Sequence, residues 1–136
     1  MSTLIGIDLQ SIDEVEASLA TFGERYERRL FTPLEIAECS GSPRRATRFA
    51  THFAAKEAMM KVLDVHDLVP PWTTIEVRDD RENGPSVSLS GAAAELARLG
   101  GITGWRLSMS NDGGVAIATV IAERTQDIDG ANSERS

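Results

Sequence analysis

The chain has little of what marks a secreted or membrane-spanning protein. Cys39 is the single cysteine among 136 residues, which excludes an internal disulfide framework and leads us to expect a cytoplasmic protein. No apolar stretch is long enough to cross a bilayer, so we expect no membrane association. The residues that follow Met1 lack a basic start and a long apolar run, so we also expect no secretory signal.

Aromatic and basic side chains are scarce as well. Aromatic residues make up 5% of a chain that is 41% hydrophobic, so aliphatic residues, alanine and methionine must form most of the core. The formal net charge of -7 argues against nucleic acid as a partner, because phosphate backbones are bound by clustered Lys and Arg. There is no Cys/His cluster with metal-ligand spacing, no dinucleotide fingerprint and no Walker-type phosphate loop.

The length and the polarity patterns predict one α+β domain. A chain of 136 residues favours a single domain, which we place at residues 1–124. Residues 125–136 have almost no apolar side chains, and we predict that they form a disordered tail. The expected elements are a strand at 4–9, helices from 12, 33 and 44, a hairpin within 73–89, a helix at 90–99 and a hairpin at 105–122. This order is typical of helices packed on a largely antiparallel sheet.

The first strand reads as buried and carries an isolated acid. The two-residue period puts Ile5, Ile7 and Leu9 on one face and Gly6 and Asp8 on the other. A buried carboxylate must be paired, hydrogen-bonded or bound to a metal. Asp8 is therefore a candidate metal ligand, or else an acid at a strand end that caps the next helix.

The long helix at 44–63 carries a second acid among small residues. Glu57 is flanked by alanines, and Lys61 follows four residues later in the favourable Glu-before-Lys order. The alternative is a surface ion pair worth about 0.3–0.5 kcal/mol, and Lys56 has the same ambiguity. Two acids in apolar elements, with lysines beside one of them, favour a divalent metal that holds a phosphorylated substrate.

A polar turn and a basic segment are further candidates for anion contacts. Ser110 and Asn111 belong to a turn whose hydroxyl, amide and backbone N–H groups can bind phosphate oxygens, although the same residues simply make a good hairpin turn. Residues 24–48 hold six arginines against four glutamates, whereas residues 1–23 hold no Lys or Arg. A locally basic belt of this kind can steer an acidic partner.

Five sequence blocks occur together in a recognisable order. They are Gly6–Leu9, Arg29–Glu35, Phe53–Ala58 followed by Lys61, Ser88–Ala93, and Trp105–Ser110. In this order the chain resembles the holo-acyl-carrier-protein synthase family of small 4′-phosphopantetheinyl transferases, over roughly residues 4–123. The FAAKEA block at 53–58 is the most specific of the five.

The resemblance implies a fold, an activity and a set of site residues. Members of the family move 4′-phosphopantetheine from coenzyme A to a serine of an acyl carrier protein and release adenosine 3′,5′-bisphosphate. Asp8 and Glu57 match the residues that hold Mg²⁺, and Lys61 matches a lysine beside the phosphates, so these three are the implied catalytic residues. Family members are usually homotrimers with active sites between subunits, and both fatty acid biosynthesis and specialised metabolism remain open.

On this reading four further residues are expected to contact the coenzyme. They are Arg48, Lys56, Ser110 and Asn111, with Lys61 as a fifth contact beside its catalytic role.

Two departures from the family pattern leave alternatives open. Asn111 stands where the family usually has histidine, and asparagine cannot take a charge near neutral pH. The first helix carries Asp13, Glu14 and Glu16 where typical members carry arginines that dock an acidic carrier protein. Docking then moves to the arginines of 25–48, or the partner is a specialised carrier domain. A non-catalytic module that binds coenzyme A or a carrier is the main alternative, and a metal-dependent phosphate hydrolase is the third.

Overall fold

The computed structural model describes residues 1–65 and 69–125 of the chain. All but the first residue of the expected tail at 125–136 lies outside the described residues. Within the described part, no helix is long and apolar enough to span a membrane. The elements in chain order are β1 (Ser2–Ser11), α1 (Ile12–Phe22), α2 (Glu24–Leu30), α3 (Pro33–Ser40), α4 (Arg45–Leu63), η1 (Trp72–Thr74), β2 (Ile75–Asp80), β3 (Gly84–Leu89), α5 (Gly91–Leu99), β4 (Ile102–Asp112) and β5 (Val115–Arg124).

Local capping groups set the helix boundaries. The Ser11 side chain accepts a hydrogen bond from the Glu14 backbone N–H at the start of α1. That helix ends at Gly23, whose φ of 54° suits glycine. Thr32 and Glu35 form a reciprocal capping box at the start of α3.

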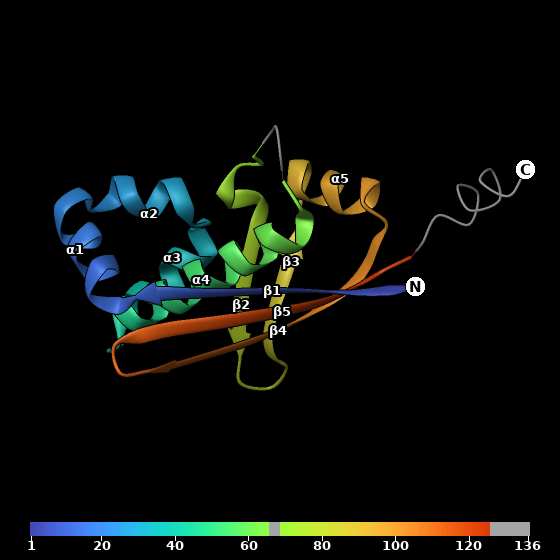
Figure 1. Ribbon diagram of the computed structural model, residues 1–136. Helices are drawn as coiled ribbons and strands as arrows, with labels where there is room; N and C mark the ends of the chain where they lie inside the picture. Colours follow the sequence, from blue (N-terminus) through green and yellow to red (C-terminus); the bar gives the residue numbers. More distant parts are fainter. Residues whose placement is uncertain (66–68, 126–136) are drawn as a thin grey trace, which may run out of the picture.

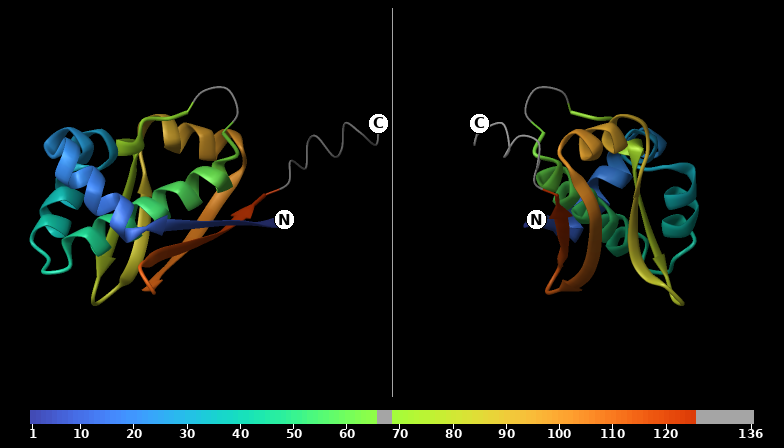
Figure 2. Two further views of the ribbon diagram at one scale, coloured as in Figure 1. Left: turned by 60° about the vertical axis from the view of Figure 1, so that its left-hand side comes forward. Right: turned by 90° about the vertical axis from the view of Figure 1, so that its right-hand side faces the viewer.

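The strands form two antiparallel sheets instead of one. The larger sheet has the order β1-β5-β4, and the smaller one is the β2–β3 hairpin. Helix α4 runs between them, contacting β1, β5 and β4 of one sheet and β2 of the other (Figures 1 and 2). The expected α+β class is confirmed, and the helix that carries Glu57 is the central element of the molecule.

Small side chains let α4 approach the larger sheet closely. The helix presents Ala54, Ala55 and Ala58, all fully buried, to the core. A Cβ atom at Gly6 would overlap the carbonyl oxygen of Ala58, so only glycine fits on β1 at that crossing. The close approach places Asp8, the next inward position on β1, beside α4.

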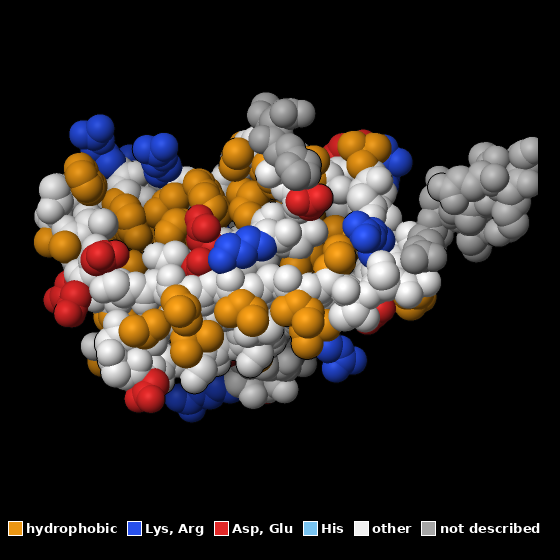
Figure 3. Space-filling view, in the orientation of Figure 1, with side chains coloured by type: hydrophobic (Ala, Val, Ile, Leu, Met, Phe, Trp, Pro, Cys, Tyr) orange, Lys and Arg blue, Asp and Glu red, His pale blue; other side chains and the backbone are white. Residues whose placement is uncertain are grey.

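The structure corrects the expectation that β1 is buried. Its two faces are as predicted, but Ile5, Ile7 and Leu9 are 63%, 53% and 60% exposed, and it is Gly6 and Asp8 that face α4. The two-residue period separates the faces of a strand without saying which one is covered. The outward face continues onto β5, where Ile121 is also exposed, and a row of hydrophobic side chains follows this part of the surface (Figure 3).

Candidate functional site

Asp8, Glu57 and Lys61 come together where β1 crosses α4. The Lys61 ammonium lies 3.3 Å from Asp8 Oδ1 and donates a 2.6 Å hydrogen bond to the Ile7 carbonyl oxygen. The Gln10 side-chain amide donates to Asp8 Oδ2 at 2.6 Å. The Asp8 side chain is only 12% exposed, whereas Lys61 is 52% exposed, so the cluster opens to solvent from the lysine side.

The two carboxylates of this cluster interact. Burial raises the pKa of Glu57, the negative charge of Asp8 raises it further, and Lys61 partly offsets both effects. A cation held between the two acids would relieve this repulsion, and carboxylate oxygens are the donors that Mg²⁺ prefers. Among the described residues no group of three or more His, Cys, Asp or Glu side chains forms a metal site, and this cluster itself offers two carboxylates. The residues present therefore fit a divalent ion that takes two protein ligands.

Three of the other predicted residues line a separate cationic pocket. Arg48, Ser110 and Asn111 border a cavity of about 360 Å³ between the start of α4, the end of β2 and the end of β4. Arg44 donates to the Asn111 side-chain oxygen at 3.1 Å, and Arg48 lies 3.3 Å from an Asp79 carboxylate oxygen. Three arginines line this pocket, of which Arg81 is the third, so an anionic ligand suits it.

The two clusters occupy different stretches of α4. Arg48 precedes Glu57 by nine residues, which corresponds to about 13 Å along a helix axis. The structure thus brings Asp8, Glu57 and Lys61 together in one place, and Arg48 with Ser110 and Asn111 in another.

Sequence reasoning missed several residues of these two clusters, among them Gln10, Asp79 and Arg81, and it placed Arg44 only among the arginines for carrier docking. Gln10 lies two positions after Asp8 on the same strand face, a signal that was available from the sequence. Asp79 and Arg81 carried no such signal, because only the tertiary structure brings the end of β2 to the start of α4.

Comparisons with known proteins identify the family of the chain. Residues 4–120 match the 4′-phosphopantetheinyl transferase superfamily. The chain belongs to this superfamily. It is 40% identical over 123 residues to the holo-acyl-carrier-protein synthase of Anaeromyxobacter dehalogenans strain 2CP-C, an alignment that covers 88% of this chain and 94% of the relative. The chain is therefore an enzyme, a 4′-phosphopantetheinyl transferase of the holo-acyl-carrier-protein synthase type.

Solved structures of such synthases share the fold. A Chronobacterium ammoniagenes ACPS–CoA complex superimposes with a TM-score of 0.80 at 26% identity, covering 93% of this chain and 100% of that one. The Helicobacter pylori holo-acyl-carrier-protein synthase in complex with coenzyme A gives a TM-score of 0.76 at 30% identity, covering 88% and 100% of the two chains.

The FAAKEA block of this transferase holds two charged residues with different surroundings. Glu57 reaches the candidate site, whereas the neighbouring Lys56 is fully buried. The Lys56 ammonium donates to Glu35 Oε1 at 2.6 Å, to the Ile75 carbonyl at 2.6 Å and to the Trp72 carbonyl at 3.1 Å. Burial lowers the pKa of Lys56, and the negative charge of Glu35 partly offsets this shift. Burial likewise raises the pKa of Glu35, and the positive charge of Lys56 partly offsets that shift.

This arrangement does not match the expectation that Lys56 contacts the coenzyme. An ammonium group has three protons, and in this structure all three have acceptors inside the protein. Lys56 instead joins α4 to α3 through Glu35, which also accepts a 2.8 Å hydrogen bond from the Val77 backbone N–H of β2.

Proposed function

We propose that this chain transfers 4′-phosphopantetheine from coenzyme A to a serine of an acyl carrier protein, in a Mg²⁺-dependent reaction that releases adenosine 3′,5′-bisphosphate. The observation that carries the proposal is the cluster of Asp8, Glu57 and Lys61, which lies at the crossing of β1 and α4 in a chain of this family. Relatives whose structures contain coenzyme A support the choice of donor.

Each residue of the cluster is proposed to have a separate role. Asp8 and Glu57 would hold the metal ion, which supplies Lewis-acid stabilisation of charge on the pyrophosphate. The Gln10 amide holds one Asp8 oxygen and so orients the carboxylate. Lys61 is the exposed cation of the cluster, and its ammonium neutralises phosphate charge and stabilises the departing bisphosphate.

The cationic pocket is proposed to bind the coenzyme through Arg48, Ser110 and Asn111. Because this pocket lies apart from the metal cluster on one chain, we propose that the two halves of a site come from neighbouring subunits of a homotrimer. The exposed apolar face of β1, with Ile5, Ile7 and Leu9, supports a subunit interface, since apolar patches of this kind usually mark one.

A mass-gain assay tests the reaction. The protein is incubated with coenzyme A, Mg²⁺ and a panel of apo carrier proteins, and we expect the carriers to gain the mass of phosphopantetheine. Asp8→Asn and Glu57→Gln should lose transfer and Mg²⁺ dependence, whereas Glu95→Gln, an exposed acid on α5, should keep both. Full activity in both cluster variants would refute the metal assignment.

A mixing experiment tests the composite site. Asp8→Asn and Arg48→Ala are each expected to be inactive alone. Unfolded and refolded together, the two variants should regain part of the activity if one subunit supplies the metal cluster and its neighbour supplies the coenzyme pocket. Ile7→Asp should dissociate the trimer in sedimentation experiments. No recovery of activity on mixing, or an Ile7→Asp variant that sediments as the parent does, would contradict the subunit arrangement.

The alternative of a non-catalytic binding module is not retained, because the chain belongs to a superfamily of transferases. Asn111 still departs from the family pattern: its side-chain oxygen accepts from Arg44, and it carries no titratable proton. If a histidine at this position assists the reaction, Asn111→His should raise the rate of transfer in the mass-gain assay, and an unchanged rate would show that no histidine is needed there.

A further inference from the structure

The two carboxylate oxygens of Asp8 have different partners. Oδ2 accepts a 2.6 Å hydrogen bond from the side-chain amide of Gln10, and Oδ1 lies 3.3 Å from the Lys61 ammonium. The NH₂ group of Gln10 must face Oδ2, because an amide oxygen and a carboxylate oxygen repel each other. One oxygen of Asp8 is therefore held by a neutral donor, and the other faces the exposed cation of the cluster.

The strand itself brings Gln10 to Asp8. The two residues are two positions apart on β1, so their side chains leave the strand on the same face. Their cross-strand partners on β5 are Ala118 and Ala116, which are fully buried and have no polar side-chain group. These neighbours offer Oδ2 no donor, and Gln10 supplies one from the same strand. Water competes little for this hydrogen bond, because the Asp8 side chain is mostly buried.

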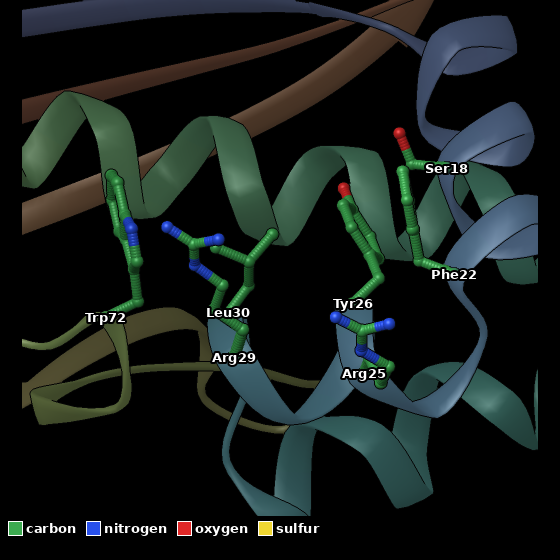
Figure 4. A pocket seen from close by; sticks show the side chains of 7 residues that line it. All are labelled: Ser18, Phe22, Arg25, Tyr26, Arg29, Leu30 and Trp72. Atoms are coloured by element: carbon green, nitrogen blue, oxygen red, sulfur yellow. The ribbon is translucent and has the colours of Figure 1, made fainter.

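A cation is better held at this cluster than in two other cavities of the protein. A groove of about 440 Å³ between α1, α2 and η1 is bordered by two arginines of α2, and none of the described residues that line it is an acid (Figure 4). The cationic pocket has three arginines and one acid, Asp79. The cavity of about 370 Å³ beside the metal cluster differs, because Glu57 and Asp64 both line it, together with Lys61.

Mg²⁺ and Ca²⁺ differ in the carboxylates that suit them. Mg²⁺ demands a near-ideal octahedral arrangement, keeps several of its waters and is bound by few protein carboxylates. Ca²⁺ takes about six to eight oxygens in a flexible arrangement, often from a carboxylate that gives both of its oxygens. A carboxylate that rotates freely can serve either ion, whereas one with an engaged second oxygen favours Mg²⁺. The cavity beside the cluster also has room for the waters that Mg²⁺ retains.

We propose that Gln10 is a positioning residue that favours Mg²⁺ over Ca²⁺ at this site. Its amide engages Asp8 Oδ2 and keeps the carboxylate from turning both oxygens to one ion, so Asp8 presents Oδ1. Lys61 does not block Oδ1, because its shorter hydrogen bond, of 2.6 Å, goes to the Ile7 carbonyl. The inference rests on the proposed function and adds the residue that decides which ion the site prefers.

Ion binding is measured directly, apart from transfer. The whole enzyme is mixed with Mn²⁺, whose free form is quantified by electron paramagnetic resonance, and added Mg²⁺ or Ca²⁺ then displaces the bound Mn²⁺. We expect the parent protein to bind Mg²⁺ and Asp8→Asn to lose this binding. In Gln10→Met the dissociation constant for Mg²⁺ should rise about tenfold, because a hydrogen bond that orients a metal ligand is lost. The constant for Ca²⁺ should change by less than about threefold, since the released carboxylate can give both oxygens.

Two further variants separate this role from a general loss of structure. Gln10→Glu places another carboxylate beside Asp8 and should tighten Ca²⁺ binding more than Mg²⁺ binding, because Ca²⁺ accepts more protein oxygens. Asn83→Leu is the matched control, since Asn83 donates a 3.2 Å hydrogen bond of the same kind to Asp80 in the turn between β2 and β3. It should leave both dissociation constants unchanged. Thermal unfolding of each variant checks that the fold is retained.

Three results would overturn the inference. They are an equal change of the two dissociation constants in Gln10→Met, no change in either, or a Gln10→Glu variant that gains more affinity for Mg²⁺ than for Ca²⁺. The proposed function fails differently, because carriers incubated with the parent protein and Mg²⁺ would then gain no phosphopantetheine mass while the Gln10 variants still show the altered ion preference. A parent protein that binds no Mg²⁺ would overturn both.

Discussion

Lys56 and Lys61 lie on the same helix five residues apart, and the structure predicts opposite consequences for the same substitution. Lys56→Met removes one partner of a fully buried ion pair and leaves Glu35 without its counter-charge. Breaking such a pair costs roughly 3–5 kcal/mol, and leaving the Trp72 and Ile75 carbonyls without a donor adds to the loss. Folded domains have only about 5–15 kcal/mol of stability, so this is a large share of the total.

The assay compares unfolding with kinetics. We expect Lys56→Met to lower the melting temperature by about 10–20 °C, from roughly 3–5 °C per kcal/mol in a domain of this size. The fraction that stays folded should keep the KM for coenzyme A of the parent protein. Lys61→Met should melt within about 5 °C of the parent, because its partly exposed ion pair contributes about 1 kcal/mol or less, and it should lose most of its kcat.

The reasoning would be refuted by the reverse result. If Lys56→Met melted with the parent and raised KM, then Lys56 would contact the coenzyme as the sequence led us to expect, and its burial would not describe the working enzyme.

Three further predictions follow from named contacts. Gly6→Ala should lower the free energy of unfolding, measured in urea, by about 3 kcal/mol, because the new Cβ would meet the backbone of α4. Gly104→Ala is the control and should change it by less than about 1 kcal/mol, because nothing lies near a Cβ at that position. Equal losses in the two variants would contradict the close packing at Gly6. Burial lowers the pKa of His52 from 6.5 to about 4, so the unfolded chain takes up a proton between these pH values and the folded one does not. This proton uptake should lower the free energy of unfolding by about 3 kcal/mol between pH 6.5 and pH 4. In urea titrations at several pH values, His52→Asn should therefore lose less stability over this range than the parent protein. The same dependence of stability on pH in both proteins would contradict the prediction. Asp79→Asn should lower the KM for coenzyme A about threefold, because it frees Arg48 from a competing carboxylate in the cationic pocket, and a raised KM would count against that pocket as the coenzyme site.

Much of the fold could be predicted because it depends on local chemistry. Ser11 and the Thr32 capping box mark helix starts, Gly23 marks a stop, and each of these signals acts within four residues. The two-residue period puts Ile75 and Val77 of β2 on one face, and both are fully buried. The division into two sheets could not be predicted, because strand pairing depends on contacts between distant segments.

The candidate site was predictable in its residues and less so in its arrangement. Resemblance identified Asp8 through the Gly6–Leu9 block, and Glu57 and Lys61 through the motif around Glu57, and the structure brings these three together. The same motif gave no means of telling Lys56 from its neighbour, because a lysine that pairs with a buried acid and one that faces solvent look alike in a helical pattern.

By itself the sequence determined the order of elements, the caps that bound them, the two faces of β1 and the family to which the chain belongs. Only the tertiary structure decided that the isoleucine face of β1 lies open while Gly6 and Asp8 face α4. The physical reason is steric, because an alanine-rich helix can approach a strand closely only where the strand has no side chain. That contact at Gly6 brings a carboxylate of β1 and a carboxylate of α4, nearly fifty residues apart in the chain, to the same place.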